Sequence, residues 1–136
     1  MVKANIFYEG ALRCRLTHGP SGAVISTDAP KDNMGKGEAF SPTDLVASAL
    51  ASCMLTTMAI VAARKGIEFR SASVEVTKEM ILDPERRIGK IHTLFEMPAG
   101  LTLDQRTTLE KAAHTCPVVK SLNPSIEIPT KFNYSD

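Results

Sequence analysis

Residues 41–66 read SPTDLVASALASCMLTTMAIVAARKG, and residues 45–63 within this stretch carry no charge at all. The opening Ser-Pro-Thr-Asp predicts a helix start, with Ser41 as the N-cap, Pro in the first helical position and Asp44 as the acid of a capping box. The closing Arg-Lys-Gly predicts its end, because cations suit the negative end of the helix dipole and Gly permits a left-handed cap. The stretch therefore predicts a helix of roughly 24 residues and about 36 Å, apolar on all sides.

A helix that is apolar on all sides is either buried in a protein or spans a membrane. This one is long enough to cross a bilayer. However, it consists mostly of Ala with Ser and Thr instead of Leu, Ile and Phe, and no aromatic belt flanks it, so we favour a buried helix and no membrane. The small side chains of Ala47, Ser48, Ala51 and Ser52 would allow another helix to approach closely. If that helix belongs to a second subunit, the chain forms an intertwined dimer.

The segments around this helix alternate between apolar and polar residues, as strands do. Short strands are predicted over 12–16 and 23–27, with a turn at Ser21-Gly22 between them, and a hairpin over 73–78 and 91–97 follows the helix. A last strand is predicted over 125–132.

Two shorter helices complete the predicted fold. Thr102 opens one of them with a second capping box, and Cys116 caps a short helix that begins at Pro117. The order of strands, long helix, hairpin, helix and strand predicts a single α+β domain over residues 1–136.

Composition excludes several classes of protein. With 136 residues, 43% of them apolar, the chain can bury a core without disulfides or metals. Its 16 basic and 15 acidic residues give a net charge of +1 with no charged run, so no nucleic-acid partner is expected. The first residues lack a cationic stretch followed by an apolar run, so we expect a cytoplasmic protein.

Three cysteines are the candidates for chemistry, because the three histidines are scattered and no metal or cofactor site is expected. Cys14 lies in an alternating strand and is expected to pack inertly. Cys53 lies in the middle of the long helix, where a buried apolar role is the usual one. Cys116 differs, because a helix N-terminus is expected to stabilise its thiolate and lower its pKa.

Residues 41–53 (SPTDLVASALASC) and 112–118 (AAHTCPV) resemble the two cysteine motifs of the OsmC/Ohr family, the osmotically inducible protein C and organic hydroperoxide resistance proteins. The resemblance covers nearly the whole chain. It implies antiparallel-rich sheets wrapped around two central helices, in an intertwined homodimer with the active site at the subunit interface. It also implies a thiol peroxidase that acts in the oxidative stress response.

The resemblance gives the two cysteines different roles. Cys53 would attack an organic hydroperoxide and become a sulfenic acid, and Cys116 would condense with it to a disulfide that a dithiol reductant then opens. A thiol desolvated among apolar side chains needs a nearby cation to ionise. The family supplies this cation as an Arg in the first strands, held by a Glu ten residues before the first cysteine.

This sequence departs from the family pattern at that point, because Thr43 stands ten residues before Cys53. Arg13 is the first candidate for the cation, and Glu38 for the carboxylate that holds it. Asp44 either replaces the missing Glu in part or only caps the helix.

An apolar pocket that favours lipophilic peroxides is expected, lined by Phe40, Leu50, Met54, Met58 and Phe95. Because the family's Arg and Glu are not at their usual positions in this sequence, two other functions stay open. One is a non-catalytic binding protein for an apolar small molecule, and the other is a redox sensor that uses the same disulfide without turnover.

Overall fold

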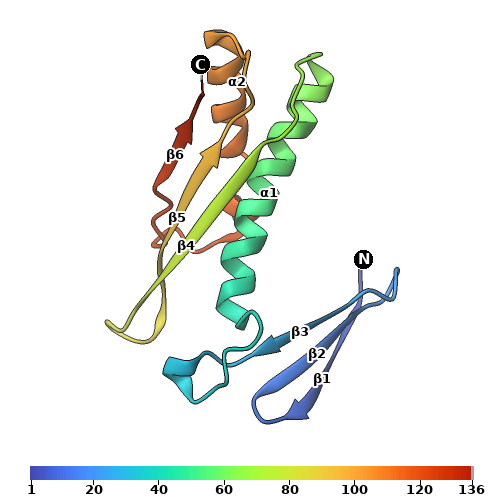
Figure 1. The fold of residues 1–136 in the computed structure, drawn as a ribbon. Coiled ribbons are helices and arrows are strands. Elements are labelled where there is room, and N and C mark those ends of the chain that lie inside the picture. Colours follow the sequence, from blue (N-terminus) through green and yellow to red (C-terminus); the bar gives the residue numbers. More distant parts are fainter. Residues whose placement is uncertain (136) are drawn as a thin grey trace. The chain divides into compact units, whose positions relative to one another are not determined.

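The computed structural model describes residues 1–135, and its contacts divide into two compact units, residues 1–46 and the unit that begins at Ala47. The fold is mixed α+β, as predicted. In chain order its elements are β1 (Ala4–Gly10), β2 (Arg13–His18), β3 (Val24–Asp28), a 3-10 turn η1 (Lys31–Asn33), α1 (Pro42–Arg64), β4 (Ser73–Ile81), β5 (Arg87–Glu96), α2 (Leu103–Ala113), α3 (Pro117–Ser121) and β6 (Thr130–Asn133) (Figure 1).

The first unit contains an antiparallel sheet in the order β1-β2-β3. The two predicted strands are confirmed, but Leu12 lies in the turn before β2 and not within a strand. Ala11 and Leu12 have φ of 52° and 62°, which is the backbone of a two-residue hairpin turn that matches the twist of its strands. This turn is not predictable from the sequence, because residues 11–12 are Ala-Leu and not the usual Asn-Gly or Asp-Gly pair.

The second unit contains the sheet β4-β5-β6. The predicted hairpin is confirmed as the antiparallel pair β4 and β5, and both strands are longer than predicted. β6 runs parallel to β5, with Phe132 opposite Phe95. It begins at Thr130 and not near residue 125, since Pro129 just before it has no N–H to offer to a ladder.

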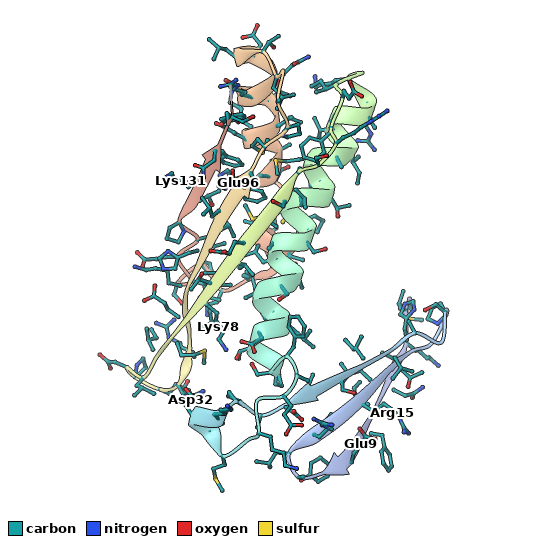
Figure 2. All side chains as sticks on the ribbon, viewed as in Figure 1. Glu9, Arg15, Asp32, Lys78, Glu96 and Lys131 are labelled. Atoms are coloured by element: carbon teal, nitrogen blue, oxygen red, sulfur yellow. The ribbon has the colours of Figure 1, made fainter. Side chains whose placement is uncertain are left out.

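The core of the second unit lies between α1, β5 and α2. Leu50, Met54 and Met58 of α1 are fully buried in one apolar cluster with Phe95 of β5 and Leu109 of α2. The sheet is amphipathic, because the neighbouring side chains of Glu96 and Lys131 are exposed (Figure 2).

The helix α1 is apolar all round, yet it is buried along one face only. The buried residues follow helical spacing: Ala47, Leu50, Ala51, Met54, Met58 and Ala62. Two of the small residues expected to meet another helix, Ala47 and Ala51, are therefore already covered, whereas Ser52 stays exposed. By length and composition α1 could also cross a membrane, a test that the core helix of a soluble protein passes equally well.

Candidate active site

The start of α1 is fixed by a reciprocal cap that confirms the prediction. The Ser41 N–H donates to Asp44 Oδ2 at 3.0 Å, and the Asp44 N–H donates to Ser41 Oγ at 3.0 Å. Of the two roles left open for Asp44, the cap is therefore the one seen in these hydrogen bonds. Cys53 follows in the middle of α1, where it is half-buried and packs against the core.

Cys116 is the N-cap of α3, as predicted, and Pro117 is the first residue of that helix. Its side chain is completely buried. The Val119 N–H donates to Cys116 Sγ at 3.3 Å. The short helix thus fixes the direction of this thiol through a backbone donor.

The fold brings Cys53 and Cys116 together, although they lie about sixty residues apart in the sequence. Cys53 packs against the apolar cluster that contains Cys116, its side chain is near enough to raise the pKa of Cys116, and both thiols are free. A pair of thiols in contact within a packed core can close to a disulfide once one of them is oxidised. The second unit therefore holds the two sulfur atoms that a dithiol–disulfide cycle requires.

The expected fall in the pKa of Cys116 is wrong. Burial raises the pKa of this thiol and outweighs the Val119 N–H, which acts in the opposite direction. The hydrogen bond with Cys53 raises the pKa of Cys116 further. The Cys116 thiol therefore ionises less readily than an exposed thiol does.

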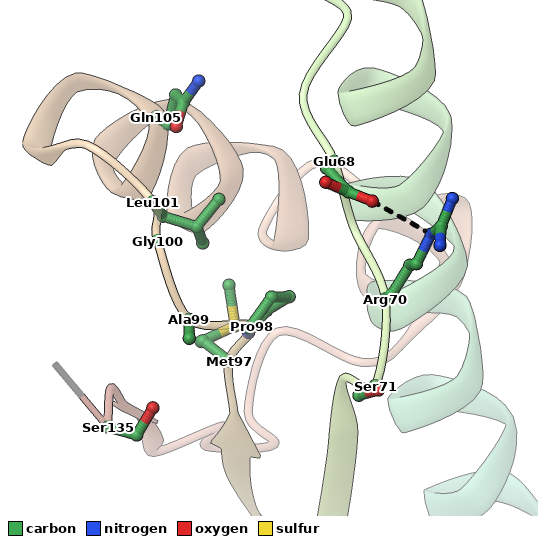
Figure 3. Close-up of a pocket in the computed structure, with 10 residues that line it drawn as sticks. All are labelled: Glu68, Arg70, Ser71, Met97, Pro98, Ala99, Gly100, Leu101, Gln105 and Ser135. Atoms are coloured by element: carbon green, nitrogen blue, oxygen red, sulfur yellow. Dashed lines mark ion pairs between the residues drawn. The ribbon is translucent and has the colours of Figure 1, made fainter.

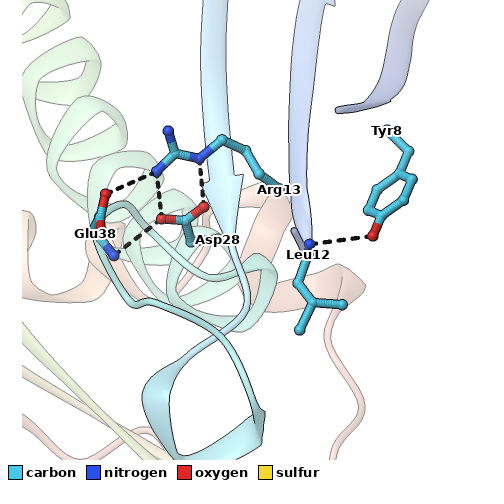
Figure 4. Close-up of polar contacts among 5 residues, drawn as sticks. All are labelled: Tyr8, Leu12, Arg13, Asp28 and Glu38. Carbon is cyan, nitrogen blue, oxygen red and sulfur yellow. Dashed lines mark hydrogen bonds and ion pairs between the residues drawn. The ribbon is translucent and has the colours of Figure 1, made fainter. Parts of the chain in front are cut away.

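Arg13 and Glu38 come together in the first unit, but a third residue holds the guanidinium more closely (Figure 4). Asp28 accepts from Arg13 Nε at 2.7 Å and from Nη2 at 2.8 Å, while Glu38 accepts from Nη2 at 3.4 Å. The hydrogen bonds to Asp28 are the main reason why the pKa of Arg13 is raised above its ordinary value. The same bonds hold the pKa of Asp28 below its usual range.

Asp28 is a partner of Arg13 that the sequence patterns do not single out, although the hairpin pattern contains the signal. Arg13 and Asp28 are direct partners in the antiparallel pair of β2 and β3. Their pairing would follow from a turn centred between Pro20 and Ser21, whereas a turn centred on Ser21-Gly22 moves the register by two residues. With the register wrong by two residues, Asp28 is no longer opposite Arg13, and the cross-strand ion pair is not predicted.

The five residues expected to line an apolar pocket have two different environments. Leu50, Met54, Met58 and Phe95 are fully buried in the core of the second unit, where they pack against one another. Phe40 belongs to the first unit and is 55% exposed. The four core residues are thus placed beside the helix that carries Cys53, and their contact with a substrate stays a prediction.

Cavities lie elsewhere among residues 1–135. One of about 610 Å³ is bordered by the Glu68–Arg70 ion pair, by Leu101 and by Gln105, and includes neither cysteine (Figure 3). Another of about 260 Å³ in the first unit has Arg13 and Lys36 in its wall. Among residues 1–135, no three His, Cys, Asp or Glu side chains are grouped so that they could hold a metal ion.

Comparison with known families gives a decisive match. The model of the OsmC-like protein family matches residues 35–131, which include both cysteine segments. This chain belongs to the OsmC-like family. The resemblance noted from the two motifs is thereby confirmed.

Solved structures agree with this membership. A crystal structure from Psychrobacter arcticus 273-4, of a proposed osmotic stress induced and detoxification response protein, is 42% identical, with a TM-score of 0.92 over 98% of this chain and 96% of that one. An organic hydroperoxide resistance protein OsmC from Legionella pneumophila is 18% identical, with a TM-score of 0.79 over 98% and 96%. OhrB of Bacillus subtilis is 19% identical, with a TM-score of 0.73 over 98% of both chains. The last two share the fold, and no curated protein matches the sequence.

Proposed function

We propose that this OsmC-like protein is a thiol-dependent peroxidase that reduces organic hydroperoxides through Cys53 and Cys116. The observation that carries the proposal is the contact between these two thiols from distant parts of the sequence. The fold is also that of proteins described as organic hydroperoxide resistance proteins.

The proposed reaction balances with one external reductant. The Cys53 thiolate attacks the terminal oxygen of ROOH, the O–O bond breaks, and the alkoxide takes a proton to leave as ROH. Cys53 is now a sulfenic acid. The Cys116 thiol attacks its sulfur, forms the Cys53–Cys116 disulfide and releases water. A dithiol reductant then opens this disulfide by exchange and is itself oxidised to a disulfide.

The protonation of Cys116 supports this division of roles. A buried thiol whose pKa is raised is a poor nucleophile in the resting state. It can, however, condense with the sulfenic acid of Cys53 once that acid has formed. Cys53 thus attacks first and Cys116 second.

We assign the activating cation to Arg13. A guanidinium is always charged and offers donors in a fixed fork, so it can stabilise both a thiolate and the departing peroxide oxygen. Glu38 is proposed as a carboxylate that helps to hold Arg13, on the basis of their 3.4 Å contact. Asp44 contributes indirectly, because its cap fixes the start of the helix that carries Cys53.

The proposed substrates are lipophilic hydroperoxides. The environment of Cys53 on α1 is formed by apolar side chains, including Leu50, Met54 and Met58. Together with Phe95 and the exposed Phe40, these residues would favour an alkyl chain over hydrogen peroxide. Burial of apolar surface is the main favourable contribution to such binding.

The working form is proposed to be a cytoplasmic homodimer in which both units of each chain form a single OsmC-like domain. Large apolar side chains of the first sheet are exposed, among them Ile6, Phe7, Tyr8, Val24 and Ile25. In the second unit, Ile60 on the uncovered face of α1 is a further exposed apolar side chain. Exposed apolar surface of this kind is typical of a subunit interface.

The proposal is tested by the consumption of cumene hydroperoxide in the presence of dihydrolipoate, a dithiol. Wild-type protein and the Cys14→Ser control should turn over, whereas Cys53→Ser should not. Without dihydrolipoate, Cys116→Ser should consume no more than a single equivalent per chain and should form no intramolecular disulfide. Equal rates for wild type and Cys53→Ser would refute the peroxidase. Rapid oxidation without recycling by any dithiol would indicate the redox sensor, and no oxidation of Cys53 at all would indicate the binding protein.

A further inference from the structure

The two sulfur atoms of the proposed redox pair differ in their access to solvent. Cys116 is 0% exposed, whereas Cys53 is half-buried. The apolar cluster that contains Cys116 is formed entirely by residues of the second unit, to which Cys53 also belongs. The cover over the Cys116 sulfur is therefore a property of this unit alone.

Cys53 has an open side on α1. Ala49 and Thr56 lie one turn from it in either direction along the helix, and both are small and exposed. Ser52, the preceding residue, is small and exposed as well. A small thiol can therefore approach Cys53 over a face of α1 that has no bulky side chain at these positions. A second subunit on α1 would narrow this route, but it would open none to Cys116.

The Cys116 sulfur has a hydrogen-bond donor within its own short helix. The Val119 N–H donates to Cys116 Sγ at 3.3 Å. A hydrogen bond to the charged form of a group favours that form, and a buried charge without such a bond is costly. The donor is thus in place at the sulfur that would carry negative charge if Cys116 left a disulfide.

We propose that the dithiol reductant attacks the Cys53–Cys116 disulfide at the Cys53 sulfur and not at the Cys116 sulfur, so that Cys116 is the thiol that leaves. This inference rests on the proposed function, which supplies both the disulfide and the dithiol.

The proposed reduction balances in two exchange steps. One thiolate of the reductant forms a bond to Cys53 Sγ, the bond between the two cysteines breaks, and its electron pair goes to Cys116 Sγ, which takes up a proton. The second thiolate of the reductant then attacks the reductant's own sulfur in the mixed disulfide. The reductant leaves as a cyclic disulfide, Cys53 is released as a thiolate, and the second proton of the dithiol goes to the solvent.

The raised pKa of Cys116 acts against this direction, because a thiol of high pKa leaves a disulfide more slowly. For an attacking thiol the Brønsted coefficient is about 0.5, about threefold in rate per pKa unit, and an effect of this order on the leaving thiol is modest. Access has the larger effect, because a thiolate must reach the sulfur that it attacks, and the Cys116 sulfur is fully covered.

The test uses the Cys14→Ser protein, in which diamide forms the Cys53–Cys116 disulfide without any hydroperoxide. Mercaptoethanol, a monothiol, is added for short times, the reaction is quenched with acid, and free thiols are alkylated with N-ethylmaleimide in urea. Peptide mapping should find mercaptoethanol on Cys53 and N-ethylmaleimide on Cys116. The same reaction carried out in urea is the matched control. There both sulfurs are accessible, so mercaptoethanol should be found on both cysteines.

A second measurement decides the question if the mixed disulfide is too short-lived to be mapped. The exchange of a thiol with dithiodipyridine passes through the same kind of transition state as attack on its mixed disulfide, so its rate reports access to that sulfur. Cys14→Ser/Cys116→Ser and Cys14→Ser/Cys53→Ser each keep one of the two cysteines, and each rate is divided by the rate of the same variant in urea. Because a covered thiol reacts only when its cover opens, this ratio should be lower for Cys116 by about a hundredfold.

The outcomes distinguish this inference from the proposed function. Mercaptoethanol chiefly on Cys116, or evenly on both cysteines of the folded protein, would overturn the inference, and so would equal rate ratios for the two single-cysteine variants. If diamide forms no disulfide between Cys53 and Cys116, the inference fails as well. If mercaptoethanol is found on Cys53 but the protein does not consume cumene hydroperoxide, the peroxidase fails and the direction of exchange stands.

Discussion

At the scale of single residues, burial reverses the pKa shift that the sequence predicts for Cys116. A cap position at a helix start suggests a reactive thiol, yet complete burial of Cys116 has the larger effect and keeps it protonated. The sequence could not reveal this balance, because the burial comes from the packing of distant segments. It could reveal the two motifs, since each is a local run of residues.

The raised pKa of Cys116 predicts an alkaline loss of stability. The folded protein binds this proton more tightly than the unfolded chain, so the stabilisation is complete below the ordinary thiol value of about 8.5 and is lost as pH rises through the folded value. The free energy of unfolding by urea, in excess dithiol, should fall between about pH 7.5 and about pH 9.5 for wild type and Cys14→Ser. Cys116→Ser should lose clearly less, and an equal loss would contradict the assignment.

The lowered pKa of Asp28 predicts the opposite dependence in acid. Here the unfolded chain binds the proton more tightly, so the stabilisation is present above the ordinary carboxyl value of about 3.9 and is lost as pH falls through the folded value. Urea unfolding of wild type should therefore weaken more steeply below about pH 4 than that of Asp28→Asn. Parallel curves for the two proteins would show that the ion pair with Arg13 does not form in solution.

Asp28 also shows why the site was only partly predictable. Residue type alone points to Arg13 and Glu38, and the structure places them in contact. Asp28, the closer partner of Arg13, follows only from the register of the β2–β3 hairpin. An error of two residues in that register changes which side chains face each other. Register is set by the whole sheet, so a single strand pattern does not determine it.

At the scale of elements, the ends of helices were predictable and their packing was not. The caps at Ser41, Thr102 and Cys116 are all local hydrogen-bond patterns, and all three are present. The buried face of α1 could not be predicted, because the helix is apolar on all sides. It has no polar face from which the opposite, buried face could be inferred. Only its neighbours β5 and α2 decide that Met54 and Met58 are inside and Ile60 is not.

The cap of α1 can be tested by Ser41→Ala, which removes the acceptor for the Asp44 N–H. The substitution should lower the free energy of unfolding by about 1 kcal/mol. Ser52→Ala is the matched control, because Ser52 is an exposed residue in the interior of the same helix. Urea unfolding measures both, and an equal effect of the two substitutions would contradict the role of the cap.

At the scale of the whole molecule, the exposed apolar side chains indicate an interface with another subunit. Five large apolar residues in the first sheet are each at least 51% exposed: Ile6, Phe7, Tyr8, Val24 and Ile25. Monomeric soluble proteins seldom expose a large contiguous apolar patch. We therefore expect a second copy of the chain to cover much of this surface.

The dimer is tested by sedimentation equilibrium at micromolar concentration. The expected mass is twice the 14.7 kDa of one chain. A single species of the chain mass would contradict the homodimer. Such a result would leave the contact between Cys53 and Cys116 intact, since both belong to the same compact unit.

The most direct measurement is a peptide map of the reduced protein after one equivalent of cumene hydroperoxide, without any added dithiol. If Cys53 and Cys116 are the peroxidatic pair, the map contains a disulfide-linked pair of peptides with Cys53 and Cys116, Cys14 is still free, and cumyl alcohol is formed in equal amount. A protein that leaves the hydroperoxide intact, with all three thiols unchanged, would contradict this assignment.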